Sequence, residues 1–232
     1  MKKNTIYSAF YRSLPVMVGY LIIGFGFGIV LRDAGYGLLW ALAMSLFIYA
    51  GSMQYVGVSL ITAPASLLTG ILTTLMINAR HLFYSISMIP KYRSAGAYKP
   101  YLIFALTDET YALLSHEDRN REDFYPFCFF VSLFNHLYWI LGTALGSLFA
   151  AALPFPTEGV SFSMTALFVS AYVEQWISGK NRLSAVLGLL VTLVCRLIFG
   201  RDLFLIPAML GITLVLLILK PKLYKEDTAH ES

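Results

Sequence analysis

Three polar side chains stand together in an apolar stretch: Asn78, Arg80 and His81, within TLMINARHLFYSISMIP (74–90). No Asp, Glu, Lys or Arg occurs from 34 to 79. An arginine at the centre of a membrane helix costs about 2.5–3.5 kcal/mol, so it normally faces a protein interior, a water-filled cavity or an anion. Arg80 is therefore a candidate to bind a substrate carboxylate. Anchoring at the membrane edge and a purely structural ion pair are the alternatives.

Two adjacent acids are the natural ion-pair candidates for Arg80. Asp108 and Glu109 lie in YLIFALTDETYALLS (101–115). Neighbours on a helix point about 100° apart, so these two carboxylates cannot share one partner equally. A carboxylate in apolar surroundings holds its proton more tightly than in water, which makes either acid a candidate proton carrier. The alternative is an interfacial segment with both acids in water. His81 is a further proton-transfer candidate, with simple hydrogen bonding as its alternative.

Two glutamines suggest an internal repeat. Gln54 and Gln175 are the only glutamines of the chain and lie 121 residues apart, as do Arg80 and Arg201. At this shift LFIYAGSMQYV falls on LFVSAYVEQWI, and RHLF falls on RDLF. Many transporters are built from such repeats. We predict a duplication with copies at about 14–116 and 125–220. The loop charges favour parallel copies, and inverted copies stay open. Gln54 and Gln175 suit amide or zwitterion recognition and interhelical hydrogen bonding equally well.

The composition places these residues in a membrane protein. The 232 residues are 58% hydrophobic and 13% charged, with a mean hydropathy of +0.69, whereas soluble domains are about a quarter charged. Charge-free runs at 13–31, 124–157 and 203–219 are long enough to span a bilayer, which takes about 20 residues. We predict an all-α polytopic membrane protein with one transmembrane domain over 1–232. The net charge of +4 does not indicate nucleic-acid binding, because basic residues cluster at the ends and in short loops.

The expected spans number seven to eight, with broken or short helices near the centre of the chain. The small, polar AGSMQ patch lies within the predicted helix 38–60; such patches occur in broken membrane helices, and continuous helices tolerate them as well. The piece 82–89 is either a re-entrant half-helix or the continuation of one long helix. Basic residues at both ends place both termini in the cytoplasm. The predicted helices cover 14–31, 38–60, 64–78, 101–115, 125–153, 162–177, 183–199 and 203–219.

Several classes of protein find no support in the sequence. There is no P-loop, no HExxH motif and no metal-spaced cysteine pair, so we expect no enzyme, cofactor or metal site. Cys128 and Cys195 lie in apolar segments and read as small buried residues rather than a disulfide framework. The first apolar run is followed by further spans and has no clear cleavage site, so we expect a helix rather than a cleavable signal peptide. Glycines 24, 26, 28, 142 and 146 predict close helix packing.

Four stretches, IYAGSMQYV, NARHLFYSISM, LTDETYAL and ALFVSAYVEQW, closely resemble the AzlC family. Its members are large subunits of two-component branched-chain amino acid exporters. The most specific pieces are AGxxQ, the block holding Asn78, Arg80, His81 and Tyr84, and the TDE block. The resemblance covers nearly the whole chain. It implies a permease of the bacterial cytoplasmic (inner) membrane that exports branched-chain amino acids, and a small membrane partner of the AzlD type.

Physics and resemblance together give a specific hypothesis. The hypothesis is a secondary transporter subunit that exports valine, leucine, isoleucine and methionine. No ATP-binding segment is evident, so we expect an ion gradient, and first of all a proton gradient, to drive export. The N-terminus of a half-helix near Leu82 adds backbone N–H groups to the substrate site. A structural or assembly subunit whose partner carries the substrate path is the alternative, and a higher oligomer is compatible with both. The predicted substrate-binding residues are Arg80, Gln54, Asn78 and Gln175, and the proton-coupling or ion-pair residues are Asp108, Glu109 and His81.

Overall fold

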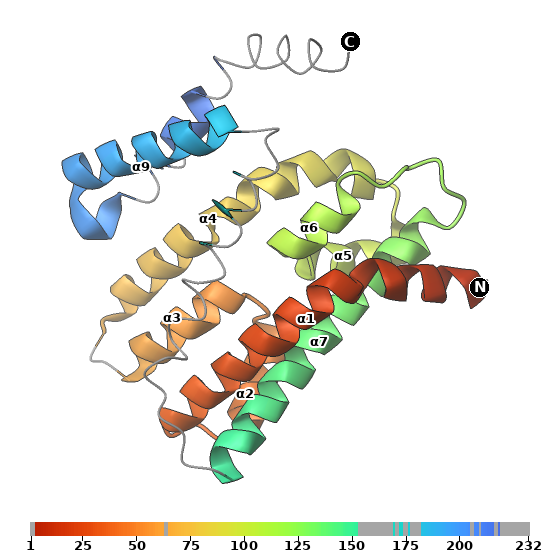
Figure 1. Cartoon of the computed structure of the whole chain (residues 1–232), viewed down its shortest axis with the longest axis horizontal. Coiled ribbons are helices and arrows are strands. Elements are labelled where there is room, and N and C mark those ends of the chain that lie inside the picture. Colours follow the sequence, from red (N-terminus) through yellow and green to blue (C-terminus); the bar gives the residue numbers. More distant parts are fainter. Residues whose placement is uncertain are drawn as a thin grey trace. The chain divides into compact units, whose positions relative to one another are not determined.

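The computed structural model describes residues 3–62, 65–152, 169, 172–173, 176, 182–204, 207–208, 210–215 and 218. All regular structure among them is helical (Figure 1). The chain divides into two compact units, Met1–Met164 and Thr165–Ser232, which are described separately. The first unit contains α1 (Lys3–Asp33), α2 (Leu38–Phe47), α3 (Gly51–Thr62), α4 (Leu67–Tyr92), the short η1 (Gly96–Tyr98), α5 (Lys99–Phe104), α6 (Asp108–Leu114) and α7 (Phe124–Ala152), and the second contains α9 (Arg182–Leu203).

The two long helices α1 and α7 pack along each other in the first unit (Figure 1). Their backbones touch where glycines meet. A Cβ on Gly28 would overlap the carbonyl oxygen of Thr143, and a Cβ on Gly146 would overlap that of Phe25. The predicted role of these glycines in close packing is therefore confirmed.

The number of spans is only partly accounted for. Within the described residues, two helices are long and apolar enough to cross a membrane, at Asn4–Asp33 and Phe124–Ala152. The span predicted at 162–177 lies largely outside the described residues, and the span predicted at 203–219 lies partly outside them. The total of seven to eight spans and the internal repeat thus stay predictions.

The predicted helix 38–60 is broken at the AGSMQ patch, between the end of α2 and the start of α3. Tyr49 adopts the left-handed conformation (φ 43°), which is costly for a residue with a side chain. The N–H of Tyr49 donates to the carbonyl oxygen of Met44 at 3.3 Å and not to that of Ser45, as it would in a continuous α-helix. The carbonyl oxygen of Ser45 therefore lacks this backbone donor. The ring of His136 on α7 takes that place, with Nε2 3.0 Å from the Ser45 oxygen.

The predicted helix 101–115 is also two pieces, α5 and α6. Thr107 caps α6 by accepting a hydrogen bond from the N–H of Thr110 at 3.3 Å. Asp108 and Glu109 follow in the first turn, where the helix dipole favours carboxylates. The side chain of His136 links this break to the other, since Tyr101 Oη lies 3.1 Å from its Nδ1.

The half-helix predicted to start near Leu82 is wrong. One continuous helix, α4, runs through Arg80 from Leu67 to Tyr92, capped by Ser66, whose side chain accepts from the N–H of Thr69. No Gly or Pro interrupts the segment after Arg80 until Pro90, and Pro90 falls in the last turn. The backbone N–H groups around Leu82 therefore belong to a helix interior and not to a helix start.

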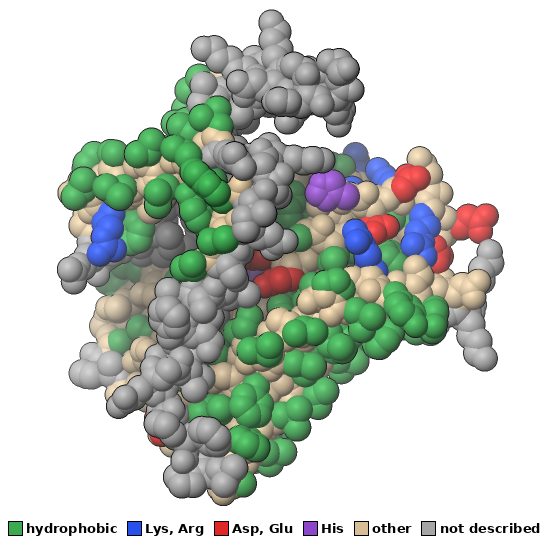
Figure 2. Space-filling model, viewed as in Figure 1, with side chains coloured by type: hydrophobic (Ala, Val, Ile, Leu, Met, Phe, Trp, Pro, Cys, Tyr) green, Lys and Arg blue, Asp and Glu red, His purple; other side chains and the backbone are tan. Residues whose placement is uncertain are grey.

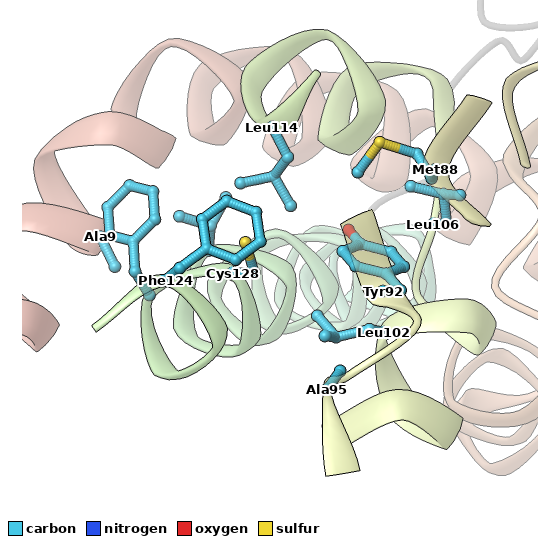
Figure 3. Packing of buried hydrophobic residues seen from close by; sticks show 11 residues of the cluster. Ala9, Met88, Tyr92, Ala95, Leu102, Leu106, Leu114, Phe124 and Cys128 are labelled. Atoms are coloured by element: carbon cyan, nitrogen blue, oxygen red, sulfur yellow. The ribbon is translucent and has the colours of Figure 1, made fainter. Parts of the chain in front are cut away.

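An apolar cluster holds the short helices against α7. Figure 3 shows Met88 and Tyr92 of α4 near Leu102 of α5 and Leu106, with Cys128 of α7 in the same cluster. Cys128 is fully buried and Cys195 is partly buried, and both are free thiols. The interpretation of Cys128 as a buried structural residue is confirmed.

The surface separates charged from apolar side chains. In Figure 2 most of the charged side chains of the first unit that this view shows gather toward one end, and hydrophobic side chains cover much of the remaining visible face. Large apolar residues such as Leu39 and Leu67 are 82% exposed. Apolar exposure on this scale marks a surface that contacts lipid or another protein.

Candidate functional site

Arg80 contacts the first turns of two helices, α3 and α6. Each of these helices begins just after an interruption in a predicted helix. Nη1 of Arg80 lies 2.6 Å from Oδ2 of Asp108, the first residue of α6. Its Nη2 donates to Oγ of Ser52, in the first turn of α3, at 2.9 Å. The side chains of Arg80 and Asp108 are 30% and 38% exposed in this chain. The cation predicted from the sequence therefore sits at a meeting point of α3, α4 and α6, in an ion pair that a ligand can reach.

The two adjacent acids take different partners, as their angular separation requires. Asp108 faces α4 through Arg80. Glu109 faces α1, where its Oε2 accepts a hydrogen bond from the hydroxyl of Tyr20 at 2.7 Å. Of the two candidate ion-pair partners for Arg80, Asp108 is the one in contact.

The Tyr20 hydroxyl carries one hydrogen but contacts two oxygens. Besides Glu109 it lies 2.7 Å from Oγ1 of Thr107. Oγ1 of Thr107 lies in turn 3.0 Å from Oγ1 of Thr110, which accepts a hydrogen bond from Nδ2 of Asn135 at 3.0 Å. When Glu109 is ionised, Tyr20 donates to it; when Glu109 is protonated, its own hydrogen serves Tyr20, which then donates to Thr107. The chain of hydroxyls accommodates Glu109 in both protonation states.

Three polar atoms beside the ion pair have no hydrogen-bond partner among the described residues. They are Oδ1 of Asp108, the hydroxyl of Tyr84 and Nδ1 of His81, all buried. The rings of His81 and Tyr84 lie 5.0 Å apart, centroid to centroid. Buried polar groups are normally satisfied, so this cluster retains the capacity to bind a polar ligand.

Of the three amides predicted to bind substrate, the structure describes two, Gln54 and Asn78. Gln54 is buried, and its Oε1 accepts from Nε1 of Trp139 on α7 at 3.0 Å. Asn78 is half-buried, two residues before Arg80 on α4. Gln175 lies outside the described residues.

Sequence reasoning missed the residues that support the acids. Tyr20, Thr110, Asn135 and His136 are all fixed by contacts over long sequence separations. The TDE block contains Thr107, but its role as the cap of α6 came only from the structure. The chain contains 15 tyrosines, and nothing in the local sequence distinguishes Tyr20 from the others.

A model of the AzlC protein family matches residues 15–153. This range is more than half of the chain and includes Arg80 and both acids. The chain belongs to the AzlC family. The resemblance carried by the NARH and TDE blocks is thereby confirmed.

Relatives of this AzlC-family chain extend the match to nearly its whole length. It is 40% identical over 224 residues to "Branched-chain amino acid transport protein AzlC" of Bacillus subtilis, covering 96% of this chain and 88% of the relative. It is 42% identical over 232 residues to an "Uncharacterized membrane protein" of Haemophilus influenzae, covering 97% and 92%. It is 27% identical over 166 residues, 68% of each chain, to "Inner membrane protein YgaZ" of Escherichia coli.

No solved structure matches the chain. The names of the relatives and the two membrane-length helices agree that this AzlC-family chain is a membrane protein.

Proposed function

We propose that this AzlC-family chain is the large subunit of a secondary transporter that exports branched-chain and related apolar amino acids. The substrates are valine, leucine, isoleucine and methionine, and the membrane is the bacterial inner membrane with both termini in the cytoplasm. The name of the Bacillus subtilis relative supports this substrate class. A small AzlD-type membrane protein completes the transporter.

The observation that carries the proposal is the position of Arg80 between Ser52 and Asp108. An amino acid brings a carboxylate and an ammonium. The carboxylate takes Arg80, because a guanidinium binds carboxylates through two parallel hydrogen bonds. Asp108, released from Arg80, then pairs with the ammonium through oxygens that include the otherwise unpartnered Oδ1. One exchange of partners thus satisfies both charges of the substrate.

The remaining site residues have secondary roles in this proposal. Asn78 and Gln54 present amides from α4 and α3, and Gln175 presents a third from the second copy of the repeat. Each amide both donates and accepts, which suits a zwitterion.

Glu109 is the proposed proton carrier. It lies next to Asp108 in the chain, and the hydroxyls of Tyr20 and Thr107 satisfy it with or without its proton. When Arg80 leaves Asp108 for the substrate carboxylate, the arrangement of charges near Glu109 changes, and this alters the proton affinity of Glu109. His81 is the second candidate for the same role.

The proposal is tested by amino acid efflux. Bacterial cells are loaded with valine, leucine or methionine as dipeptides, and efflux is followed with this chain, with its small partner alone, and with the pair. Arg80→Ala is compared with Arg119→Ala, which removes an exposed loop arginine. We expect efflux by the pair, loss with Arg80→Ala and wild-type efflux with Arg119→Ala, at equal membrane levels.

Other outcomes have distinct meanings. Efflux that persists with Arg80→Ala removes this residue from the substrate path. Amino acid binding by the purified partner, and none by this chain, supports an assembly role instead. Efflux that ignores a collapsed proton gradient and follows the substrate gradient indicates a passive channel.

A further inference from the structure

A second site lies away from the acids, between the end of α4 and the start of α5. It is a groove of about 480 Å³. Its floor consists of buried apolar side chains, Met88, Tyr92 and Leu106, which Figure 3 shows side by side. Ile89 and Ile103 form its walls and are 63% and 57% exposed. The groove is therefore an apolar slot that opens to the surroundings of the protein.

Two cations line the same groove. Arg93 and Lys99 are both exposed, and neither forms an ion pair or hydrogen bond with a described residue. Lys91, two residues before Arg93, differs, because its Nζ donates to the carbonyls of Leu114 at 3.1 Å and Glu117 at 3.0 Å. Lys91 thus has a structural role in holding the end of α6, while Arg93 and Lys99 leave two positive charges beside an apolar slot.

The groove continues into a stripe of apolar side chains on α4. Leu82, Ile86 and Ile89 are spaced by four and three residues, which places them on one face of a helix. They are 67%, 64% and 63% exposed. In a membrane protein such a stripe contacts acyl chains. A ligand that extends from this stripe into the groove has an apolar tail and ends beside Arg93 and Lys99.

The charge of the ligand head follows from the lining. Among the residues that the structure describes, no Asp or Glu lines the groove, so the described lining does not favour the cationic part of a choline or ethanolamine head group. A further donor is the hydroxyl of Tyr92, which is buried in the floor and has no hydrogen-bond partner among the described residues. Cations without acids select an anionic head over a zwitterionic one.

We propose that this groove binds an anionic phospholipid, with Arg93 and Lys99 holding the phosphate and the acyl chains lying along the α4 stripe. Basic pockets beside membrane helices on the cytoplasmic side are suited to such head groups. Both cations belong to the basic stretch PKYRSAGAYKP (90–100), and an excess of Lys and Arg in a short loop predicts the cytoplasmic side of the membrane. The site is independent of the proposed transport function, because it shares no residue with the Arg80 cluster.

The test is native mass spectrometry of the purified full chain with dioleoylphosphatidylglycerol, dioleoylphosphatidylcholine or inorganic phosphate. A cation near the membrane surface contributes about fivefold to the binding of an anionic lipid. We expect Arg93→Gln and Lys99→Gln each to weaken phosphatidylglycerol binding about fivefold, and the double variant about thirtyfold. Arg119→Gln, which removes an equally exposed loop cation, leaves binding unchanged.

A second variant keeps both cations and fills the slot. Ile103→Trp adds bulk at the groove wall, and we expect it to displace phosphatidylglycerol while the chain elutes as the wild type does. Four results overturn the proposal: equal binding of the two phospholipids by the wild type, an effect of the double variant no larger than that of Arg119→Gln, undiminished binding by Ile103→Trp, or displacement of the lipid by free phosphate, which would make the ligand a soluble anion.

Discussion

The ion pair of Arg80 and Asp108 allows stability and transport to be separated. Its closest nitrogen and oxygen are 2.6 Å apart, but about a third of each side chain is exposed. Exposed pairs contribute about 0.2–1 kcal/mol, and hydrogen bonds to charged groups about 1.5–3 kcal/mol. We place the coupling energy of this partly exposed pair at about 1–2 kcal/mol.

The perturbation is a double-mutant cycle with Arg80→Gln, Asp108→Asn and both together. Each single variant leaves one charge without its partner, so each is destabilised more than the sum of lost contacts implies. In the double variant two neutral amides face each other, and stability returns in part. For a chain of this size about 1 kcal/mol shifts the melting temperature by about 2–4 °C. We therefore expect the double variant to melt about 2–8 °C above the value that additivity predicts.

In the double variant we expect valine export to stay lost even though the melting temperature partly recovers. Two amides cannot replace the guanidinium that takes the substrate carboxylate, so we expect the double variant to fold and yet export no valine. The assays are thermal unfolding in detergent and efflux from proteoliposomes that also contain the small partner. Wild-type efflux by the double variant would refute the substrate contact of Arg80. Additive melting temperatures would refute the energetic coupling of the pair.

Three further predictions concern the scaffold. Gly146→Ala forces α1 and α7 apart and should cost at least about 1–3 kcal/mol, whereas Gly19→Ala, with open space at its Cβ, should gain about 1 kcal/mol in helix propensity; equal melting temperatures would contradict the close packing. Tyr49→Gly relieves about 1–2 kcal/mol of left-handed strain but loses a buried ring, typically about 3–5 kcal/mol, so a net fall in melting temperature is expected, and a rise would show that strain dominates. Arg121 and a bond from Thr5 lower the pKa of Asp123 to about 2 from the ordinary 3.8, so this carboxylate stabilises the fold above pH 3.8 and loses that effect as the pH falls toward 2; Asp123→Asn should flatten the acid limb of the stability curve, and an unchanged limb would refute this.

The sequence alone identified the class of protein and the residues of interest. Charge-free runs of membrane length cannot be placed in a soluble domain of this size, and a lone arginine among them requires a partner. The NARH and TDE blocks sufficed to indicate the AzlC family, which the family match confirmed. The glycine contacts also followed from residue type, because close backbone contact depends on small side chains. The AGSMQ patch left a continuous and a broken helix equally possible, and the structure shows the broken one.

Only the tertiary structure decided which residues meet. In the structure Asp108, and not Glu109, forms the ion pair with Arg80. Glu109 accepts a hydrogen bond from Tyr20, and Gln54 accepts one from Trp139. The structure also showed that the chain continues helically through Leu82, which decides between the two alternatives for 82–89 in favour of one long helix. Local sequence sets the angle between neighbouring side chains, but the partner at that angle comes from a helix far away in the chain. That choice depends on how whole helices pack, which no short stretch of residues encodes.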